Sequence, residues 1–171
     1  MTPLPAALGG TELVGWRLDR ARHAPTWDSG EGAFLFGGRW NSEGVRVVYC
    51  ALDPATTILE VAVHKGFATL DTDPQVMTRF RVDAGSDIRI VAPGDVPNPN
   101  WLKPGAPSAG QQAFGDALVA AHPFVLIPSV VSAFSWNLLF VATNATGRYH
   151  LIEQHPFALD TRLNPPSKPK P

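Results

Sequence analysis

The chain has 171 residues, one cysteine and a formal net charge of −1, with 14 Lys and Arg against 15 Asp and Glu. This length favours one domain, and the near-neutral charge argues against nucleic-acid binding by the chain alone. A single cysteine excludes a disulfide framework and a cysteine-based metal site, and no apolar run reaches the ~18 residues of a membrane span. We expect a cytoplasmic protein, because the first residues also lack the pattern of a secretion signal.

The first elements expected along the chain are a short leader, a strand and a polar loop. Residues 1–12 are small and polar, with two prolines, which predicts a flexible leader. Residues 13–18 are predicted to form the first strand, which contains Arg17. Residues 20–32 are mixed and polar, so we expect a loop that faces a substrate or covers it as a lid.

A second strand, residues 46–51, leads into a helix with clear boundary signals. Asp53 can cap this helix, Pro54 suits its first turn and Gly66 can end it. Its expected apolar face consists of Ala55, Ile58, Leu59, Ala62 and Val63. The opposite face is expected to carry the polar residues Thr56, Thr57, Glu60 and His64. The last two are four residues apart and can approach each other across one turn.

Two more strands and a second helix are expected in the middle of the chain. The strands are predicted over residues 76–82 and 88–91, and a long loop rich in Pro, Gly and Asn follows over residues 93–107. Ser108 and Gln111 have the spacing of a capping box, so a helix should begin there. Its predicted apolar stripe consists of Ala113, Phe114, Ala117, Leu118 and Ala121.

The last third of the chain is predicted to be mostly strand. An apolar strand over residues 124–132 is interrupted by Pro128 and Ser129. Further strands are expected over residues 138–142 and 149–153.

Together these elements predict an α+β fold, because strands and helices do not alternate regularly. One compact domain is expected over residues 13–163, with mixed or antiparallel sheets and two or three helices. Residues 164–171 are rich in Pro and Lys and are predicted to form a disordered tail. The chain contains no GxGxxG or Walker sequence, which argues against a Rossmann or P-loop nucleotide site.

Arg39, Tyr49 and Glu60 are the main candidates for chemistry. Arg39 lies in a Gly-Gly-Arg-Trp-Asn turn, and a guanidinium can bind phosphate through a bidentate fork. Tyr49 is expected near the end of a strand, where its ring can stack on a flat cationic heterocycle. Glu60 can stabilise the positive charge that develops on a sugar when its glycosidic bond breaks. A cation, an aromatic ring and an anion together suit a phosphate-bearing, positively charged substrate such as NAD.

Each of these residues also has an ordinary structural interpretation. Arg39 could pair with an acid at the surface, Tyr49 could pack in the core, and Glu60 could be solvated on a polar helix face. Ser129 is equally suited to bonding a substrate or its own backbone. Cys50 lies in an apolar run, which favours a small buried hydrophobe over a nucleophile. The five histidines show no metal-ligand spacing, so no metal site is expected.

Several motifs resemble those of the RES domain, a family named for arginine, glutamate and serine that supplies toxins of bacterial toxin–antitoxin pairs. In chain order they are Gly15-Trp16-Arg17, Gly37-Gly38-Arg39-Trp40-Asn41-x-x-Gly44, Val48-Tyr49-x-Ala51, Glu60-Val61-x-x-His64 and Val125-Leu126-Ile127-Pro128-Ser129. Asn137 and residues 159–163 resemble the closing segments of the family. The resemblance covers residues 13–163 and is most specific over residues 37–64.

The resemblance implies a fold similar to that of ADP-ribosyltransferase toxins, with NAD+ held in a cleft. It implies cleavage of the nicotinamide–ribose bond by phosphorolysis or hydrolysis, with NAD+ as substrate, inorganic phosphate as a co-substrate and no further cofactor. Transferred by position, the roles are phosphate binding by Arg17 and Arg39, nicotinamide contact by Tyr49, stabilisation of the ribosyl cation by Glu60, and substrate contact by Ser129 and Asn137.

The family also implies a partner, a helix-turn-helix antitoxin of the Xre type. A segment of this antitoxin would enter the NAD cleft, and the complex could contain a homo-oligomer of the toxin. No direct contact with nucleic acid or membrane is expected. Two alternatives to NAD+ degradation stay open: mono-ADP-ribosylation of a host protein, and a non-catalytic regulatory protein that binds NAD+.

Overall fold

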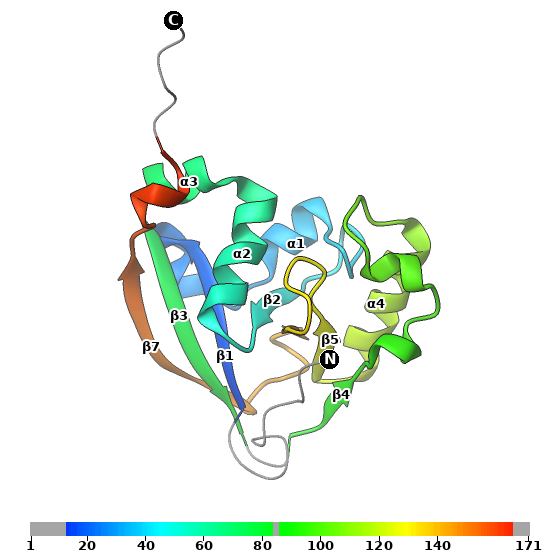
Figure 1. The fold of residues 1–171 in the computed structure, drawn as a ribbon. Helices are drawn as coiled ribbons and strands as arrows, with labels where there is room; N and C mark the ends of the chain where they lie inside the picture. Colours follow the sequence, from blue (N-terminus) through cyan, green and yellow to red (C-terminus); the bar gives the residue numbers. More distant parts are fainter. Residues whose placement is uncertain (1–12, 84–85, 166–171) are drawn as a thin grey trace, which may run out of the picture.

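The computed structural model describes residues 13–83 and 86–165, which Figure 1 draws as a coloured ribbon. A seven-stranded sheet has the strand order β4-β5-β6-β2-β1-β3-β7. Neighbouring strands are antiparallel except for β4 and β5, which are parallel. The strands are β1 (Leu13–Arg20), β2 (Val48–Ala51), β3 (Gln75–Val82), β4 (Ile88–Ile90), β5 (Phe124–Pro128), β6 (Trp136–Phe140) and β7 (Tyr149–Phe157).

Helices accompany this sheet, and Figure 1 shows α2 in front of β1 and β2 and α4 beside β5. In the described part of the chain the α-helices are α1 (Glu31–Phe36), α2 (Pro54–Lys65), α3 (Phe67–Thr72) and α4 (Ala109–Ala121). Short 3-10 helices are η2 (Ala21–Thr26), η3 (Pro93–Asp95), η4 (Pro99–Leu102) and η5 (Thr161–Leu163). One mixed sheet with few helices confirms the predicted α+β fold.

The core lies mainly against the central strands β5 and β6, in which every residue is buried. Their continuous apolar sequences are typical of strands covered on both faces. Aromatic rings pack together on one side of the sheet, namely Trp27, Phe80, Phe124, Phe140 and Tyr149. Burying such a ring contributes about 1.5–3 kcal/mol, so the cluster fixes the segment that contains Trp27.

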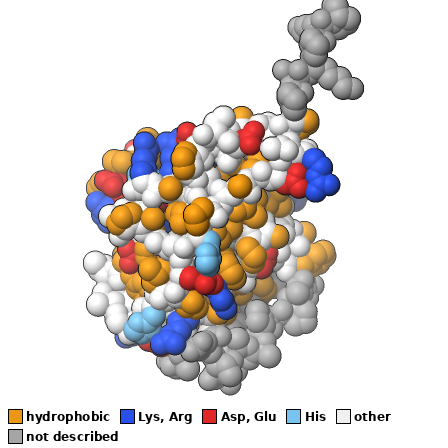
Figure 2. Space-filling view, turned by 90° about the vertical axis from the view of Figure 1, so that its left-hand side faces the viewer, with side chains coloured by type: hydrophobic (Ala, Val, Ile, Leu, Met, Phe, Trp, Pro, Cys, Tyr) orange, Lys and Arg blue, Asp and Glu red, His pale blue; other side chains and the backbone are white. Residues whose placement is uncertain are grey.

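Strand β7 forms one edge of the sheet, and Figure 2 shows this side of the molecule with charged side chains interspersed among apolar ones. Leu151 and Ile152 are exposed on this strand. They are followed by Glu153, which forms an ion pair with Arg79 of β3 at 3.1 Å, and then by Pro156. Charges and a proline on an edge strand oppose pairing with a second chain, so this edge is protected against extension of the sheet.

Helix α2 turns only part of its predicted apolar face inward, since Ala62 is buried and Ile58 packs against the core. Thr56 and Thr57 are buried, whereas Leu59 and Val63, which were assigned to the apolar face, are 36% and 60% exposed. Thr57 Oγ1 donates to the carbonyl of Trp16 on β1 at 3.1 Å, so a polar contact seats the helix on the sheet. The predicted caps at both ends are confirmed.

Helix α4 also confirms its predicted stripe only in part, since Phe114 and Leu118 pack against the core. The residues that it buries are Gln111, Gly115 and Val119, and the alanines of the predicted stripe are exposed. A Cβ built on Gly115 would lie 2.0 Å from the carbonyl oxygen of Trp40. Only a glycine lets the helix come this close to the Trp40 carbonyl. A pattern based on apolar residues cannot indicate that a glycine is buried.

Gly115→Ala is therefore expected to lower the free energy of unfolding by about 2–3 kcal/mol, because the new methyl group must push α4 away from the Trp40 carbonyl. This loss should outweigh the gain in helix propensity of about 1 kcal/mol. Gly110→Ala is the matched control on the same helix, since its Cβ would meet the nearest atom at 3.4 Å. Urea denaturation measures both variants, and equal stability of the two would contradict the expectation.

Three six-residue helices were not predicted. Together η2 and α1 occupy most of the segment expected to be a polar loop, and α3 directly follows Gly66. Helices of six residues contain at most about two turns, so a helical period does not stand out in their sequences. Among the described residues, no helix is long and apolar enough to cross a membrane. The leader predicted over residues 1–12 and residues 166–171 of the predicted tail lie outside the described residues.

Candidate active site

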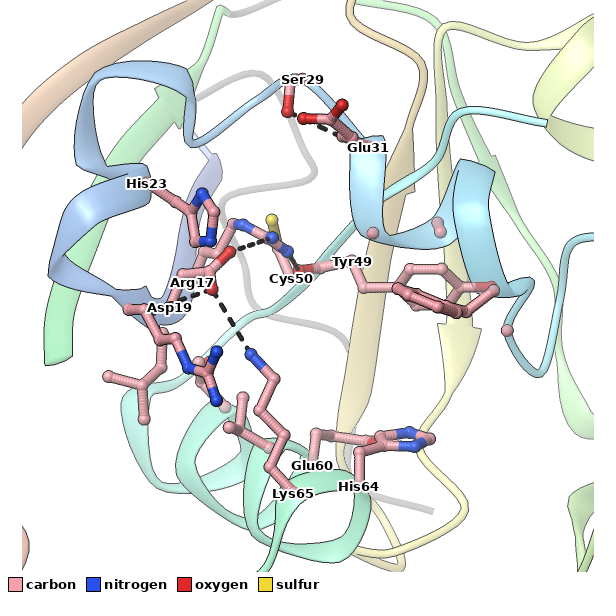
Figure 3. A pocket seen from close by; sticks show the side chains of 18 of the residues that line it. Arg17, Asp19, His23, Ser29, Glu31, Tyr49, Cys50, Glu60, His64 and Lys65 are labelled. Carbon is pink, nitrogen blue, oxygen red and sulfur yellow. Dashed lines mark hydrogen bonds and ion pairs between the residues drawn. The ribbon is translucent and has the colours of Figure 1, made fainter. Parts of the chain in front are cut away.

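A cavity of about 820 Å³ opens between α2, the strands β1 and β2 and the segment from η2 to Arg39. Figure 3 shows it with lining side chains from each of these elements. The segment 20–32, predicted to face a substrate, contributes Arg20, Arg22, His23, Thr26, Ser29, Glu31 and Gly32. Of the site residues predicted from the sequence, those that line the cavity are Arg17, Arg39, Tyr49, Glu60 and Asn137.

Glu60 is held by two side chains that come from distant parts of the sequence. Its Oε1 accepts a hydrogen bond from Ser129 Oγ at 2.8 Å and another from Asn137 Nδ2 at 2.6 Å. Ser129 directly follows β5 and Asn137 lies in β6, the neighbouring strand. Pairing of the two strands therefore brings both donors to one carboxylate. Within residues 13–83 and 86–165, both hydrogen bonds of the carboxylate are to Oε1, and Glu60 lines the cavity.

Ser129 and Asn137 are each only 7% exposed. Ser129 Oγ also accepts a bond from the Ser132 N–H at 3.0 Å, so this serine bonds both its own backbone and a side chain of the site. Asn137 Oδ1, in contrast, is buried and has no partner in the described part of the chain. Leaving such a group unpaired costs about 1–3 kcal/mol, and a ligand that supplies a hydroxyl or amide donor would remove this cost.

Arg39 lies in a tight loop that passes so close to Tyr49 that the preceding position must be glycine. Gly38 forms a β-bridge with Asn41, and a Cβ on Gly38 would lie 2.7 Å from Tyr49 Oη. The Arg39 guanidinium is half-buried, and its Nη2 donates to the Gly105 carbonyl at 2.8 Å. A guanidinium has five N–H donors, so most of them remain free to bind an anion in the cavity.

Tyr49 uses its hydroxyl inside the protein. The hydroxyl donates to Asn41 Oδ1 at 2.7 Å and accepts from the Trp40 N–H at 3.0 Å. Burial raises the pKa of this hydroxyl above its usual value, so Tyr49 is a neutral phenol at physiological pH. The ring is the part that a ligand can contact, which suits stacking rather than proton transfer.

Arg17 is paired within the protein as well as lining the cavity. Its Nη1 donates to the Tyr49 carbonyl at 2.9 Å and its Nη2 to Asp19 at 2.6 Å. Lys65 lies 3.4 Å from the same carboxylate, and Figure 3 shows the three side chains together. Burial opposes ionisation of Asp19, but the charges of Arg17 and Lys65 outweigh it and lower the pKa of this carboxyl. The cluster leaves this part of the cavity with one net positive charge.

Asn41 is a site residue that the sequence did not assign to any role. It is fully buried, and its Nδ2 lies 2.9–3.0 Å from the carbonyl oxygens of Ala33, Ser42 and Val45. It therefore shapes the Arg39 loop from inside while its Oδ1 orients Tyr49. An asparagine among glycines indicates a turn, but nothing in the pattern shows that its side chain points inward.

Cys50 is buried in the core beside this site, and burial raises the pKa of its thiol to about 12. A thiol that stays protonated at neutral pH is a poor nucleophile, which confirms the interpretation of Cys50 as a small buried hydrophobe. Among the residues described, there is no group of three or more His, Cys, Asp or Glu side chains that could hold a metal ion.

Comparisons with known proteins identify the family of this chain. The chain matches the RES domain over residues 14–160. It is 25% identical over 154 residues to Toxin Res of Photorhabdus laumondii, covering 88% of this chain and 97% of that protein. It is 33% identical over 134 residues to the Prs ADP-ribosylating toxin of Sphingobium sp. (strain YBL2), covering 72% of this chain and 79% of that protein.

The fold is similar to a chain in the crystal structure of the M. tuberculosis MbcT-MbcA toxin–antitoxin complex. The TM-score is 0.70 at 21% sequence identity, over 87% of this chain and 86% of that chain. The family match extends from β1 beyond β7 and includes the residues that line the cavity. The chain therefore belongs to the RES domain family.

Proposed function

We propose that the protein is the toxin of a bacterial toxin–antitoxin pair and degrades NAD+ by cleaving the nicotinamide–ribose bond. The observation that carries this proposal is the orientation of Glu60. One of its oxygens is fixed by Ser129 and Asn137, and the residue lines a cavity that Arg39 and Tyr49 also line. Relatives named Toxin Res and a fold shared with a chain of a toxin–antitoxin complex support the biological role.

The cleavage step follows from the charge of Glu60. When the bond between ribose C1′ and the nicotinamide nitrogen breaks, both electrons stay with nitrogen and nicotinamide leaves as a neutral molecule, without a proton. The ribose becomes an oxocarbenium cation, which the Glu60 carboxylate stabilises. Because Ser129 and Asn137 already orient this carboxylate, little reorganisation is needed at that moment. An oxygen of phosphate or water then forms the new bond to C1′, and water also releases a proton.

The remaining lining residues suit the other parts of NAD+. Arg39 has free donors for the diphosphate, and Arg17 on β1 adds positive charge although it is already paired with Asp19. The ring of Tyr49 provides a face for the cationic nicotinamide. Asn137 Oδ1, which lacks a partner among the described residues, accepts a hydrogen bond from a ribose hydroxyl or from the carboxamide.

A helix-turn-helix antitoxin of the Xre type is the partner that this function requires. A segment of it that entered the cavity would exclude NAD+ and so silence the enzyme. Leu35 and Phe36 of α1 line the cavity and are exposed to solvent. Apolar side chains at such a mouth favour contact with a protein segment.

Incubating the purified protein with NAD+, with and without inorganic phosphate, tests the proposal. We expect the release of free nicotinamide. Mass spectrometry then identifies the second product. ADP-ribose indicates hydrolysis, and ADP-ribose-1″-phosphate formed only with phosphate indicates phosphorolysis. Unchanged NAD+ in both samples, from folded protein free of antitoxin, would contradict the proposal. Binding of NAD+ without turnover would support the regulatory alternative.

Transfer of ADP-ribose to a protein is the second candidate, because one relative is named an ADP-ribosylating toxin. The same oxocarbenium cation would then be attacked by a side chain of the target protein. Labelled NAD+ added to a cell lysate distinguishes the two activities. A discrete labelled protein band indicates transfer, whereas label found only in small molecules indicates degradation.

A further inference from the structure

Helix α4 is hydrogen-bonded to the Arg39 loop through side chains that do not line the cavity. Gln112 Nε2 donates to the Gly38 carbonyl at 3.0 Å, and Asp116 Oδ1 accepts from the Ser42 N–H at 3.0 Å. Between these two bonds, Gly115 lets the helix lie against Trp40. One helix therefore bonds the loop both before and after Arg39 in the sequence.

We propose that Gln112 and Asp116 are positioning residues for the diphosphate of the substrate, acting through Arg39. This inference rests on the proposed function, in which Arg39 binds that diphosphate. Both bonds join residues 74 positions apart in the sequence, and neither side chain lines the cavity. These side chains would thus fix the position of the Arg39 guanidinium and would not contact NAD+.

The loop needs this support because of its glycines. Gly37 has a φ of 64°, and Gly38 has no Cβ to restrict it. Asn41 fixes the inner half of the loop from within the core. The outer half, which carries Arg39, is bonded to the protein through the α4 bonds, the Trp40 N–H to Tyr49 Oη and the exposed Gly105 carbonyl. Without the α4 bonds the guanidinium would be held less firmly, and substrate binding would weaken because Arg39 would meet the diphosphate in fewer of its conformations.

Substitution of Gln112 and Asp116 tests the inference against matched controls. Gln112→Ala and Asp116→Ala are expected to raise KM for NAD+ about tenfold, with kcat changed less than about twofold. Asp116→Asn keeps the Oδ1 acceptor and should restore KM to the wild-type value. Gln112→Glu has nearly the same shape but no donor, so it should behave like Gln112→Ala. Ala113→Ser, an exposed change on the same helix, should have no effect.

A double-mutant comparison separates positioning from general support of the fold. In an Arg39→Ala background, Gln112→Ala should not change KM further, because the residue through which it acts is gone. A further tenfold increase there would overturn the inference, and so would a Gln112→Ala variant indistinguishable from Ala113→Ser. The dissociation constant of ADP-ribose, measured by calorimetry on the same variants, should change in parallel with KM. A wild-type protein that binds ADP-ribose but leaves NAD+ intact would contradict the proposed function alone.

Discussion

Glu60→Gln is expected to lower kcat/KM for NAD+ cleavage about 100- to 1,000-fold while the fold is preserved. A glutamine can present its Oε1 to Ser129 Oγ and Asn137 Nδ2, the two donors that lie at 2.8 and 2.6 Å from Glu60. The geometry is then retained and only the negative charge is lost. Removing a preorganised group that faces a developing charge costs about 2.7–4 kcal/mol. Initial rates of nicotinamide release, measured by chromatography, check this prediction.

Glu43→Gln is the control for this experiment, because Glu43 is exposed and lies outside the cavity. Both variants should melt within a few degrees of the wild type, since neither loses a buried hydrogen bond. A Glu60→Gln variant that keeps activity within tenfold of the wild type would remove Glu60 from the mechanism. Retained binding of NAD+ together with lost turnover would also exclude the regulatory alternative.

The strands and the two long helices were predictable because their signals are local. The first strand was expected over residues 13–18 and is found as Leu13–Arg20. Asp53 caps α2 by accepting the Thr56 N–H at 2.8 Å, as its position before Pro54 indicates. Alternation, caps and turn residues each need only a few neighbouring positions, so a single sequence displays them.

The inward faces of the helices were predictable only in part. Thr57 is buried because its hydroxyl donates a hydrogen bond to the Trp16 carbonyl on β1. Gly115 is buried because the backbone of Trp40 lies against it. Both contacts depend on partners far away in the sequence. Apolar periodicity assumes that a helix is held by apolar contacts alone, and it is wrong where a hydroxyl or a bare backbone makes the contact.

In the site, the residue types could be predicted from the sequence, but their arrangement could not. Arg39, Tyr49 and Glu60 could be chosen from their chemistry, and the structure places all three on one cavity. The bonds from Ser129 and Asn137 to Glu60 could not be foreseen, because they follow from the pairing of β5 with β6. A carboxylate expected on a solvated helix face is instead held by buried donors.

Arg39→Ala is expected to raise KM for NAD+ about 30-fold with little change in kcat. A hydrogen bond to a charged group contributes about 1.5–3 kcal/mol, and the loss falls on substrate binding because the diphosphate is remote from the bond that breaks. The only protein partner that the change would release among the described residues is the exposed Gly105 carbonyl, so stability should be nearly unchanged. Arg148→Ala, at an exposed position outside the cavity, is the control.

Nicotinamide riboside sharpens this prediction, because it contains the bond that is cleaved but no diphosphate. If Arg39 acts on the diphosphate, Arg39→Ala should leave kcat/KM for the riboside unchanged, whereas Glu60→Gln should lower it as strongly as for NAD+. An equal loss on both substrates would instead place Arg39 near the ribose and the leaving group. The ratio of the two losses thus locates the guanidinium along the substrate, independently of how tightly NAD+ is bound.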